Sequence, residues 1–238
     1  MKFLVFFYLL LVSFCAFTQK EKPQNYKRYD ERSLHFGFML GFNKSDFIVY
    51  QNIDAYQKYG LISVTSKGIP GGQVGIVSTL KLWTPMVRLR VIPTLSFQER
   101  VLNYTFVNKK DPNGKNLMYE ERVGSTDLDL PLMLQFRTLR LNNFAAYLLV
   151  GGQFTLDLQS QEKASQSYTD PFIKIKKKDY QGQIGGGVEF FAPYFKFGME
   201  VKYSQGFNNS FIQDNTEPSN PIDRLYNKTL WFSFIFEG

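Results

Sequence analysis

The sequence predicts an all-β fold: an eight-stranded antiparallel up-and-down transmembrane β-barrel with four long outer loops. The first observation behind this prediction is an alternation with a period of two, seen where Leu34, Phe36, Phe38, Leu40 and Phe42 stand at every second position. Such a period places one set of side chains on one face of a β-strand and the intervening set on the other. Across the chain one face is aliphatic and aromatic and the other is rich in Gly, Gln, Thr and charged residues. That distribution is typical of a wall with lipid outside and a polar interior.

The second observation is the order of the connections, which are long and short in turn. We expect strands at about 34–43, 72–82, 87–98, 127–137, 144–158, 179–191 and 195–204, with a last strand after residue 225. A long polar segment that reaches Pro70, a tall hairpin that turns at Asp111–Gly114, and the polar loops 159–178 and 207–225 alternate with tight turns. Barrels of the outer membrane have short periplasmic turns and long extracellular loops. Pro131 lies inside the fourth strand, where its missing N–H predicts a local bulge or distortion.

The N-terminal residues 1–18 are expected to be a secretory signal peptide. Lys2 precedes an unbroken apolar run over 3–12, and Ala16 supplies a small residue before a cleavage site near Thr18 and Gln19. Residues 19–33 are charged and are expected to form a short periplasmic lead-in, followed by the barrel over 34–238. Beyond the signal peptide there is no apolar run of about 18 residues, so helical spans are not expected.

The single cysteine, Cys15, raises the alternative of a lipid anchor. Phe14 argues against it, because a small residue is needed at that position. Once the signal peptide is removed, the chain would hold neither a disulfide nor a thiol nucleophile.

The formal net charge of +7 is scattered along the chain. Its one short run, Lys176 to Lys178, is interpreted as a solvated loop. A basic stripe interleaved with aromatic residues, as in nucleic-acid binders, is missing from the sequence, so we expect no nucleic-acid partner.

The interior of an eight-stranded barrel is just wide enough to be filled by side chains. Buried charges must be paired, and the sequence therefore predicts an internal salt-bridge network. A ligand or ion site inside the barrel is the alternative, although no spacing demands it. The charged residues expected on the inward face are Arg88, Arg90, Asp129, Arg137, Asp157, Glu189, Lys196, Glu200 and Lys202.

The sequence shows no set of residues typical of an enzyme's active site. His35 is the only histidine, and we expect it to be an interior, hydrogen-bonded residue at the periplasmic end of the first strand. No zinc-ligand set, P-loop or nucleophile elbow is present. Asp214, Glu217 and Asp223 lack the regular spacing of a calcium loop and are interpreted as loop acids. We predict a non-enzymatic protein without catalytic, cofactor-binding or metal residues and without a cofactor.

Large aromatic residues fit a girdle at the membrane interface, as with Trp83, Tyr194 and Trp231. Trp231, however, alternates with the outward residues of the last strand, so packing inside the barrel is its alternative position.

Four segments carry a resemblance to a known family: Leu34–Asn43, Asp127–Leu134, Ala146–Gly152 and Tyr194–Phe197. With these segments the chain resembles the outer-membrane β-barrel family of Bacteroidetes, and within it the PorT family of the type IX secretion system. The resemblance implies an integral outer-membrane barrel that assembles or supports this machinery, whose cargo includes gliding adhesins and proteases. It implies outer-membrane lipid and other type IX components as partners, and no small-molecule substrate.

Two other functions remain open from the sequence. A general binding or adhesion barrel would present its tall loops, such as residues 103–122, to an external ligand. A soluble lipid-binding barrel would need the apolar face of each strand to point inward.

Overall fold

A computed structural model describes residues 24–108, 115–162 and 172–238. The expected signal peptide, the start of the lead-in and the turn at Asp111–Gly114 lie outside the described residues.

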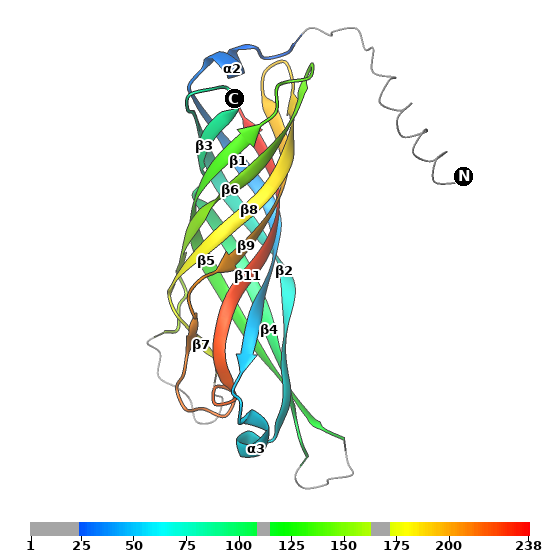
Figure 1. Cartoon of the computed structure of the whole chain (residues 1–238), viewed down its shortest axis with the longest axis vertical. Helices are drawn as coiled ribbons and strands as arrows, with labels where there is room; N and C mark the ends of the chain where they lie inside the picture. Colours follow the sequence, from blue (N-terminus) through cyan, green and yellow to red (C-terminus); the bar gives the residue numbers. More distant parts are fainter. Residues whose placement is uncertain (1–23, 109–114, 163–171) are drawn as a thin grey trace, which may run out of the picture.

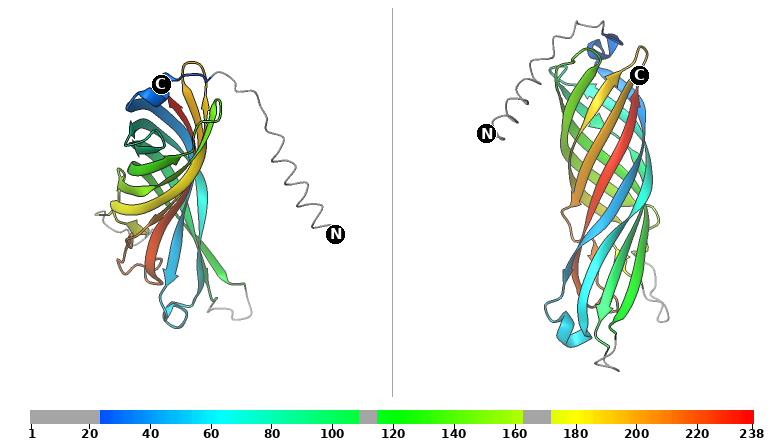
Figure 2. Two further views of the ribbon diagram at one scale, coloured as in Figure 1. Left: turned by 45° about the horizontal axis from the view of Figure 1, so that its top comes forward. Right: turned by 90° about the vertical axis from the view of Figure 1, so that its right-hand side faces the viewer.

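The described chain is a single antiparallel sheet that closes into a barrel, because β1 pairs with both β11 and β2 (Figures 1 and 2). A two-stranded sheet and two short helices, α2 (Arg28–Glu31) and α3 (Ala55–Tyr59), complete it. The small sheet pairs β7 (Lys174–Ile175) with β10 (Phe211–Ile212). The wall consists of β1 (Leu34–Gln51), β2 (Leu61–Lys81), β3 (Val87–Val91), β4 (Thr94–Phe106), β5 (Leu117–Arg137), β6 (Phe144–Asp157), β8 (Lys178–Phe191), β9 (Lys196–Gly206) and β11 (Ile222–Glu237). No helix in the described ranges is both long and apolar enough to cross a bilayer.

The nine wall strands make eight barrel strands, since β3 and β4 are two halves of one strand interrupted at Ile92 and Pro93. Both halves pair with β2 on one side and β5 on the other. The expected eight-stranded barrel is therefore confirmed. The β5–β6 register runs through Pro131 without a shift, so no bulge forms on that side. The distortion expected at Pro131 is found on the other side, where the pairing of β5 with β3 and β4 is interrupted opposite Leu130 and Pro131. In the neighbouring strand, Pro93 also has no N–H to give to a ladder.

The connections sort to the two ends of the barrel, as the sequence predicts. One end, called here the short-turn end, carries the turns 82–86, 138–143 and 192–195 together with α2 and the C-terminus (Figure 1). The opposite end, called the long-loop end, carries α3, the tall β4–β5 hairpin and the loops that contain β7 and β10.

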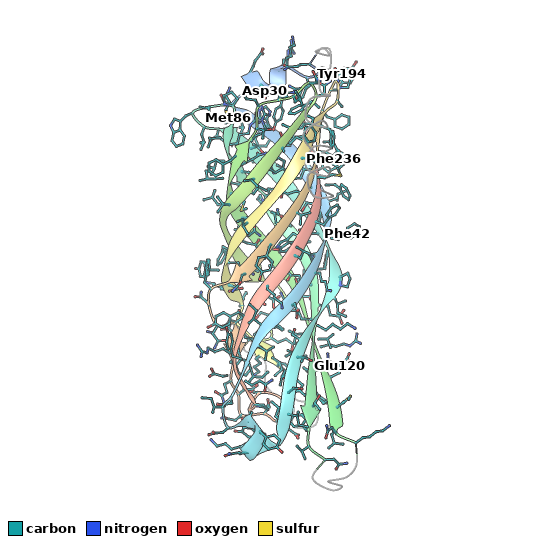
Figure 3. The ribbon with its side chains drawn as sticks, turned by 45° about the vertical axis from the view of Figure 1, so that its right-hand side comes forward. Asp30, Phe42, Met86, Glu120, Tyr194 and Phe236 are labelled. Carbon is teal, nitrogen blue, oxygen red and sulfur yellow. The ribbon has the colours of Figure 1, made fainter. Side chains whose placement is uncertain are left out.

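The outer face near the short-turn end is apolar. Phe36, Phe38 and Phe42 of β1 are each more than half exposed, at 59, 51 and 62 %. Figure 3 shows Phe42 and Phe236 on the outside of neighbouring tilted strands. In water so large an exposed apolar surface would be costly, whereas hydrocarbon accepts it. This outward orientation excludes the soluble lipid-binding barrel, which requires the apolar face inside.

Toward the long-loop end the two faces exchange character. Beyond Phe42, the outward residues of β1 become Lys44 and Asp46, and Asp46 pairs with Lys228 at 3.2 Å. The inward residue Phe47 is instead buried and apolar. Polar outside and apolar inside is the arrangement of a water-soluble β-structure. The strands thus continue past the lipid-facing belt into water.

This exchange corrects the expected strand ends. The polar segment up to Pro70 is largely strand, because β1 runs to Gln51 and β2 begins at Leu61. Likewise β5 begins at Leu117, well before the expected 127. Inside this tall part lies an apolar cluster sealed by the loops of β7 and β10. Its buried members are Phe47, Ala55, Leu61, Val64, Leu102, Tyr104, Val123, Ile173, Phe211, Ile222 and Leu225.

Candidate functional site

The barrel interior near the short-turn end holds a buried ion-pair network. Arg90 of β3 lies at its centre, 2.7 Å from Glu200 of β9, 3.8 Å from Glu189 of β8 and 3.9 Å from Glu237 of β11. Tyr147 of β6 adds a hydrogen bond of 2.9 Å to Glu200, and its ring lies 5.3 Å from the Arg90 guanidinium. One cation thus links strands from opposite parts of the sequence. Such a network is stabilising only while each charge keeps its partners.

Lys196 of β9 forms the second half of this network. Its ammonium lies 2.8 Å from Glu189 and also pairs with Glu237. Lys202, on the same strand, pairs with Glu200 at 2.8 Å. Inward positions of β8, β9 and β11 carry these charges because the polar residues alternate with the lipid-facing ones.

The lead-in reaches into the mouth of the barrel at the short-turn end. Asp30 of α2 lies 2.6 Å from Arg137, 2.9 Å from Arg140 and 3.4 Å from Arg88. Burial alone would raise the pKa of Asp30, but the hydrogen bonds and charges of Arg137 and Arg140 hold it below its usual value. Asp30 therefore stays charged and holds α2 over the opening.

Tyr29 fills the space beneath Asp30 and is fully buried. Its hydroxyl accepts a hydrogen bond of 2.6 Å from Lys196 and donates one of 3.1 Å to Glu237. The Arg88 guanidinium lies 4.4 Å from the centre of its ring, a cation–π distance. Burial, followed by the charges of Glu237 and Glu189, raises the pKa of Tyr29, so the phenol keeps the proton that it donates.

The charged residues predicted for the inward face are all buried in the interior, and the predicted salt-bridge network is confirmed. Sequence reasoning missed Tyr29, Asp30 and Glu237. The alternation in the last strand could have placed Glu237 on the inward face, because Leu230, Phe232, Phe234 and Phe236 face outward. Nothing in the charged lead-in distinguishes Asp30 from its solvated neighbours.

The only histidine is interior and hydrogen-bonded, as predicted. His35 is buried, its Nε2 lies 3.2 Å from the Arg32 carbonyl oxygen, and its ring stacks on Tyr29 at 3.8 Å. Trp231 packs inside, where its Nε1 donates a hydrogen bond of 2.9 Å to Ser204, whereas Trp83 and Tyr194 are exposed on turns of the short-turn end.

A second charged layer lies inside the barrel nearer the long-loop end, and it is acidic. Asp127 and Asp129 of β5, Asp157 of β6 and Asp179 of β8 are all buried there, with Arg100 of β4. Asp129 is well satisfied, because Ser96, Gln153 and Thr155 donate hydrogen bonds of 2.6–2.7 Å to it. The sequence predicted Asp129 and Asp157 here but not the layer as a whole.

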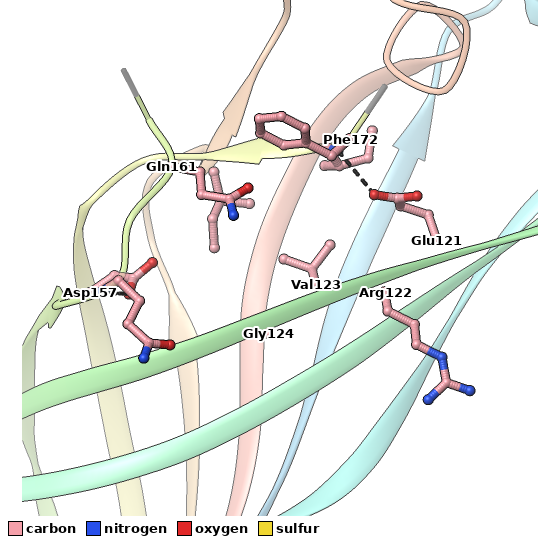
Figure 4. A pocket seen from close by; sticks show the side chains of 10 residues that line it. Glu121, Arg122, Val123, Gly124, Asp157, Gln161 and Phe172 are labelled. Atoms are coloured by element: carbon pink, nitrogen blue, oxygen red, sulfur yellow. Dashed lines mark hydrogen bonds between the residues drawn. The ribbon is translucent and has the colours of Figure 1, made fainter. Parts of the chain in front are cut away.

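Above this layer a cavity of about 310 Å³ lies between β5 and the chain that follows β6 (Figure 4). Asp157, Glu121 and Gln161 contribute polar groups to its lining, and Val123 and Ile173 contribute apolar ones. The loop acids Asp214, Glu217 and Asp223 do not contribute to it. In the described ranges no three His, Cys, Asp or Glu side chains converge as metal ligands do.

A closed barrel with an apolar outer belt and a paired, charged interior defines an integral membrane β-barrel. The model of the family described as outer membrane protein beta-barrel domain matches residues 17–212, and the chain belongs to this family. Among solved structures the chain is similar to the outer membrane protein OprG from Pseudomonas aeruginosa. The match has 15 % identity and a TM-score of 0.49, and it covers 87 % of this chain and 95 % of that one. The search of curated proteins found no match.

Proposed function

We propose that this outer-membrane barrel is a non-enzymatic accessory component of the type IX secretion apparatus. Its role would be to assemble or support machinery that secretes gliding-related cargo. In this proposal the short-turn end faces the periplasm and the long loops face the cell exterior. The partners would be outer-membrane lipid and other type IX components.

The observation that carries the proposal is the occupied interior. The network around Arg90 and Lys196, capped by Tyr29 and Asp30, fills the short-turn end of the barrel. Eight strands leave an interior that is just wide enough for side chains. Folded cargo cannot pass through such a barrel, so a part in secretion has to be exerted through contacts with other proteins. The resemblance of Leu34–Asn43 and Asp127–Leu134 to the PorT family favours the type IX apparatus among secretion systems.

A deletion strain tests the proposal. Cargo with C-terminal sorting domains should disappear from the cell surface and accumulate in the periplasm, and the intact gene should restore it. A strain that still displays cargo normally would overturn the proposal. Asp54→Asn serves as the control for complementation, because it changes only an exposed pair with Lys58 at 3.1 Å.

The orientation can be tested separately by cysteine labelling of intact cells. Ile53 next to α3 is 98 % exposed at the long-loop end, and Leu139 is 75 % exposed at the short-turn end. A maleimide reagent too large for outer-membrane pores should label Ile53→Cys on intact cells. It should label Leu139→Cys only after the outer membrane is opened. The reverse pattern would invert the proposed orientation.

A general binding or adhesion barrel is the second candidate function. It is favoured by the exposed apolar tip of the tall hairpin, where Leu117 and Met118 are 56 and 85 % exposed. Shortening the connection 107–116 should abolish binding to an external ligand and leave secretion intact if this candidate is correct. Loss of secretion on the same change would favour the type IX role.

A further inference from the structure

The acidic layer of the interior contains two carboxylates that face each other across a ladder. Asp127 of β5 and Asp157 of β6 are direct partners in the β5–β6 register. Asp179 of β8 is opposite Thr155, so it lies diagonally from Asp157 on the same inward face. Like charges directly opposite on neighbouring strands destabilise a sheet. A cation between or beside them removes that cost.

The described residues place little buried positive charge beside Asp127, Asp157 and Asp179. Arg100 lies 4.0 Å from Asp127, and it is the one buried cation that the described residues place beside these three acids. The other buried cation that acts on the layer, Lys202, acts on Asp129. Lys177, whose carbonyl oxygen accepts the backbone N–H of Asp157, has an exposed side chain. Three buried carboxylates facing one guanidinium leave an excess of negative charge where solvation is weak.

Part of this layer also lacks hydrogen-bond donors among the described residues. Asp157 Oδ1 accepts the backbone N–H of Gln159 at 2.9 Å, and Asp127 Oδ2 accepts the Ser125 hydroxyl at 3.1 Å. Asp179 accepts hydrogen bonds through Oδ2, of 2.8 Å from Asn227 and 3.1 Å from Gln181. The other oxygens of the same three side chains, Asp179 Oδ1, Asn227 Oδ1 and Gln181 Oε1, are buried and accept none. Buried oxygens are nearly always satisfied in native proteins. A set of acceptors without donors is therefore a site short of a donor as well as of a positive charge.

A route to this layer exists through the cavity at the long-loop end, because Asp157 lines it (Figure 4). Val123, Ile173 and Ile175 form an apolar part of the lining. Arg122 also lines the cavity but is paired elsewhere, 3.3 Å from Glu99 and 2.9 Å from Glu120 on the outer face. A ligand in the cavity would thus meet an apolar wall and a carboxylate.

We propose that this cavity binds a primary alkylammonium group, with the nitrogen at Asp157 and the alkyl chain along Val123, Ile173 and Ile175. An ammonium provides three N–H donors and one positive charge. It would add both to a layer in which three carboxylates have one guanidinium beside them and three buried oxygens accept no hydrogen bond. A bare metal ion fits less well, since no three metal-ligating side chains converge within the described ranges. The inference is independent of the type IX role.

The same ammonium could come from a free alkylamine or from a lysine side chain of another polypeptide. Two probes separate these sources: n-pentylamine, and lysine blocked as its N-acetyl amide. 1-Pentanol is the neutral control, with the same chain and no charge. Binding is measured by calorimetry on the full-length protein in detergent micelles at neutral pH.

We expect n-pentylamine to bind and 1-pentanol not to bind. Asp157→Asn should weaken binding roughly ten- to a hundredfold, because a charge-assisted hydrogen bond is lost. Asp54→Asn removes an exposed carboxylate at the same end and should leave binding unchanged. Binding of the blocked lysine in addition would identify a lysine side chain as the source, and binding of the amine alone would identify free amines.

Three results would overturn the proposal. The first is a lack of binding by both amines to the wild-type protein. The second is that the wild type, Asp157→Asn and Asp127→Asn all bind n-pentylamine with the same affinity. The third is displacement of n-pentylamine by calcium at equal concentration, which would assign the acids to a metal ion. Secretion assays are not part of this test, so its failure leaves the type IX proposal standing.

Discussion

The ammonium of Lys196, on β9, donates a hydrogen bond of 2.6 Å to the hydroxyl of Tyr29, in the lead-in helix α2. These residues are 167 positions apart in the sequence. Tyr29 in turn donates to Glu237 on the closing strand β11. The lead-in is therefore a structural part of the barrel, and the ion pairs of Asp30 beside it should contribute to stability.

Replacing Asp30 with asparagine should destabilise the folded barrel. Arg88, Arg137 and Arg140 would lose the carboxylate they share. Less negative charge would then remain to offset the cost of burying their guanidinium groups. We expect a loss of about 1–3 kcal/mol, below the full value for a buried pair because the Asp30 side chain is 28 % exposed. Urea unfolding in detergent or lipid vesicles measures it. Asp54→Asn is the matched control and should change stability by less than about 0.5 kcal/mol.

The contribution of Asp30 should depend on pH in a defined direction. Its pKa is lower in the folded protein than the unfolded value of about 3.9. The stabilisation is therefore fully present above pH 3.9 or so and is lost as the pH falls through the lower, folded pKa. Unfolding measured down to strongly acidic pH should show a decline in the wild type that is smaller in Asp30→Asn. If the free energy of unfolding fell equally with pH in the wild type and in Asp30→Asn, Asp30 would not be the group responsible.

Gly187 on β8 should not tolerate a side chain. A Cβ at this position would lie 2.5 Å from the hydroxyl oxygen of Tyr147 and 2.4 Å from the carbonyl oxygen of Met199. Gly187→Ala should displace Tyr147 from Glu200 and cost about 1–3 kcal/mol, as for other overpacked interiors. Gly72→Ala is the control, since a Cβ there meets nothing within 4 Å. Thermal unfolding of the two variants compares them, and equal melting temperatures would refute the packing argument.

Leu102 tests the apolar cluster at the long-loop end. It is fully buried in that cluster, so Leu102→Ala should destabilise the packing there by about 2–5 kcal/mol. The lipid-facing belt would keep its residues, so the barrel should still insert. With the long-loop end facing the cell exterior, as proposed above, we expect faster proteolysis of the tall part on intact cells and unchanged membrane insertion. Leu117→Ala, at an exposed position, should be cleaved at the wild-type rate.

The faces of the strands could be predicted from the sequence because alternation is a local property of a strand. Phe38 points to lipid and Arg90 points inward for the same geometric reason, and neither needs knowledge of its neighbours. The order of loop lengths likewise follows from positions along the chain.

The ends of the strands could not be predicted, because the alternation reverses its sense where the wall leaves lipid. Lys44 outside and Phe47 inside break the pattern that Phe38 and Phe42 establish. In the sequence, the segment after Phe42 therefore resembles a polar loop. The place of Asp30 and the acidic layer around Asp179 depend on contacts between distant segments. Cross-strand register, which a single sequence does not contain, brings Asp127 opposite Asp157.

The pairing of Glu237 also has a consequence for the order of assembly. The carboxylate of Glu237 forms an ion pair with Lys196 and accepts a hydrogen bond from Tyr29. The strand that carries it, β11, closes the barrel by pairing with β1. Until this last strand is in place, β1 keeps an unsatisfied edge and the cations of the interior lack one of their anions. The ring and the charge balance are thus completed in the same event, so a barrel arrested before that event would present both defects together to the quality control of the cell.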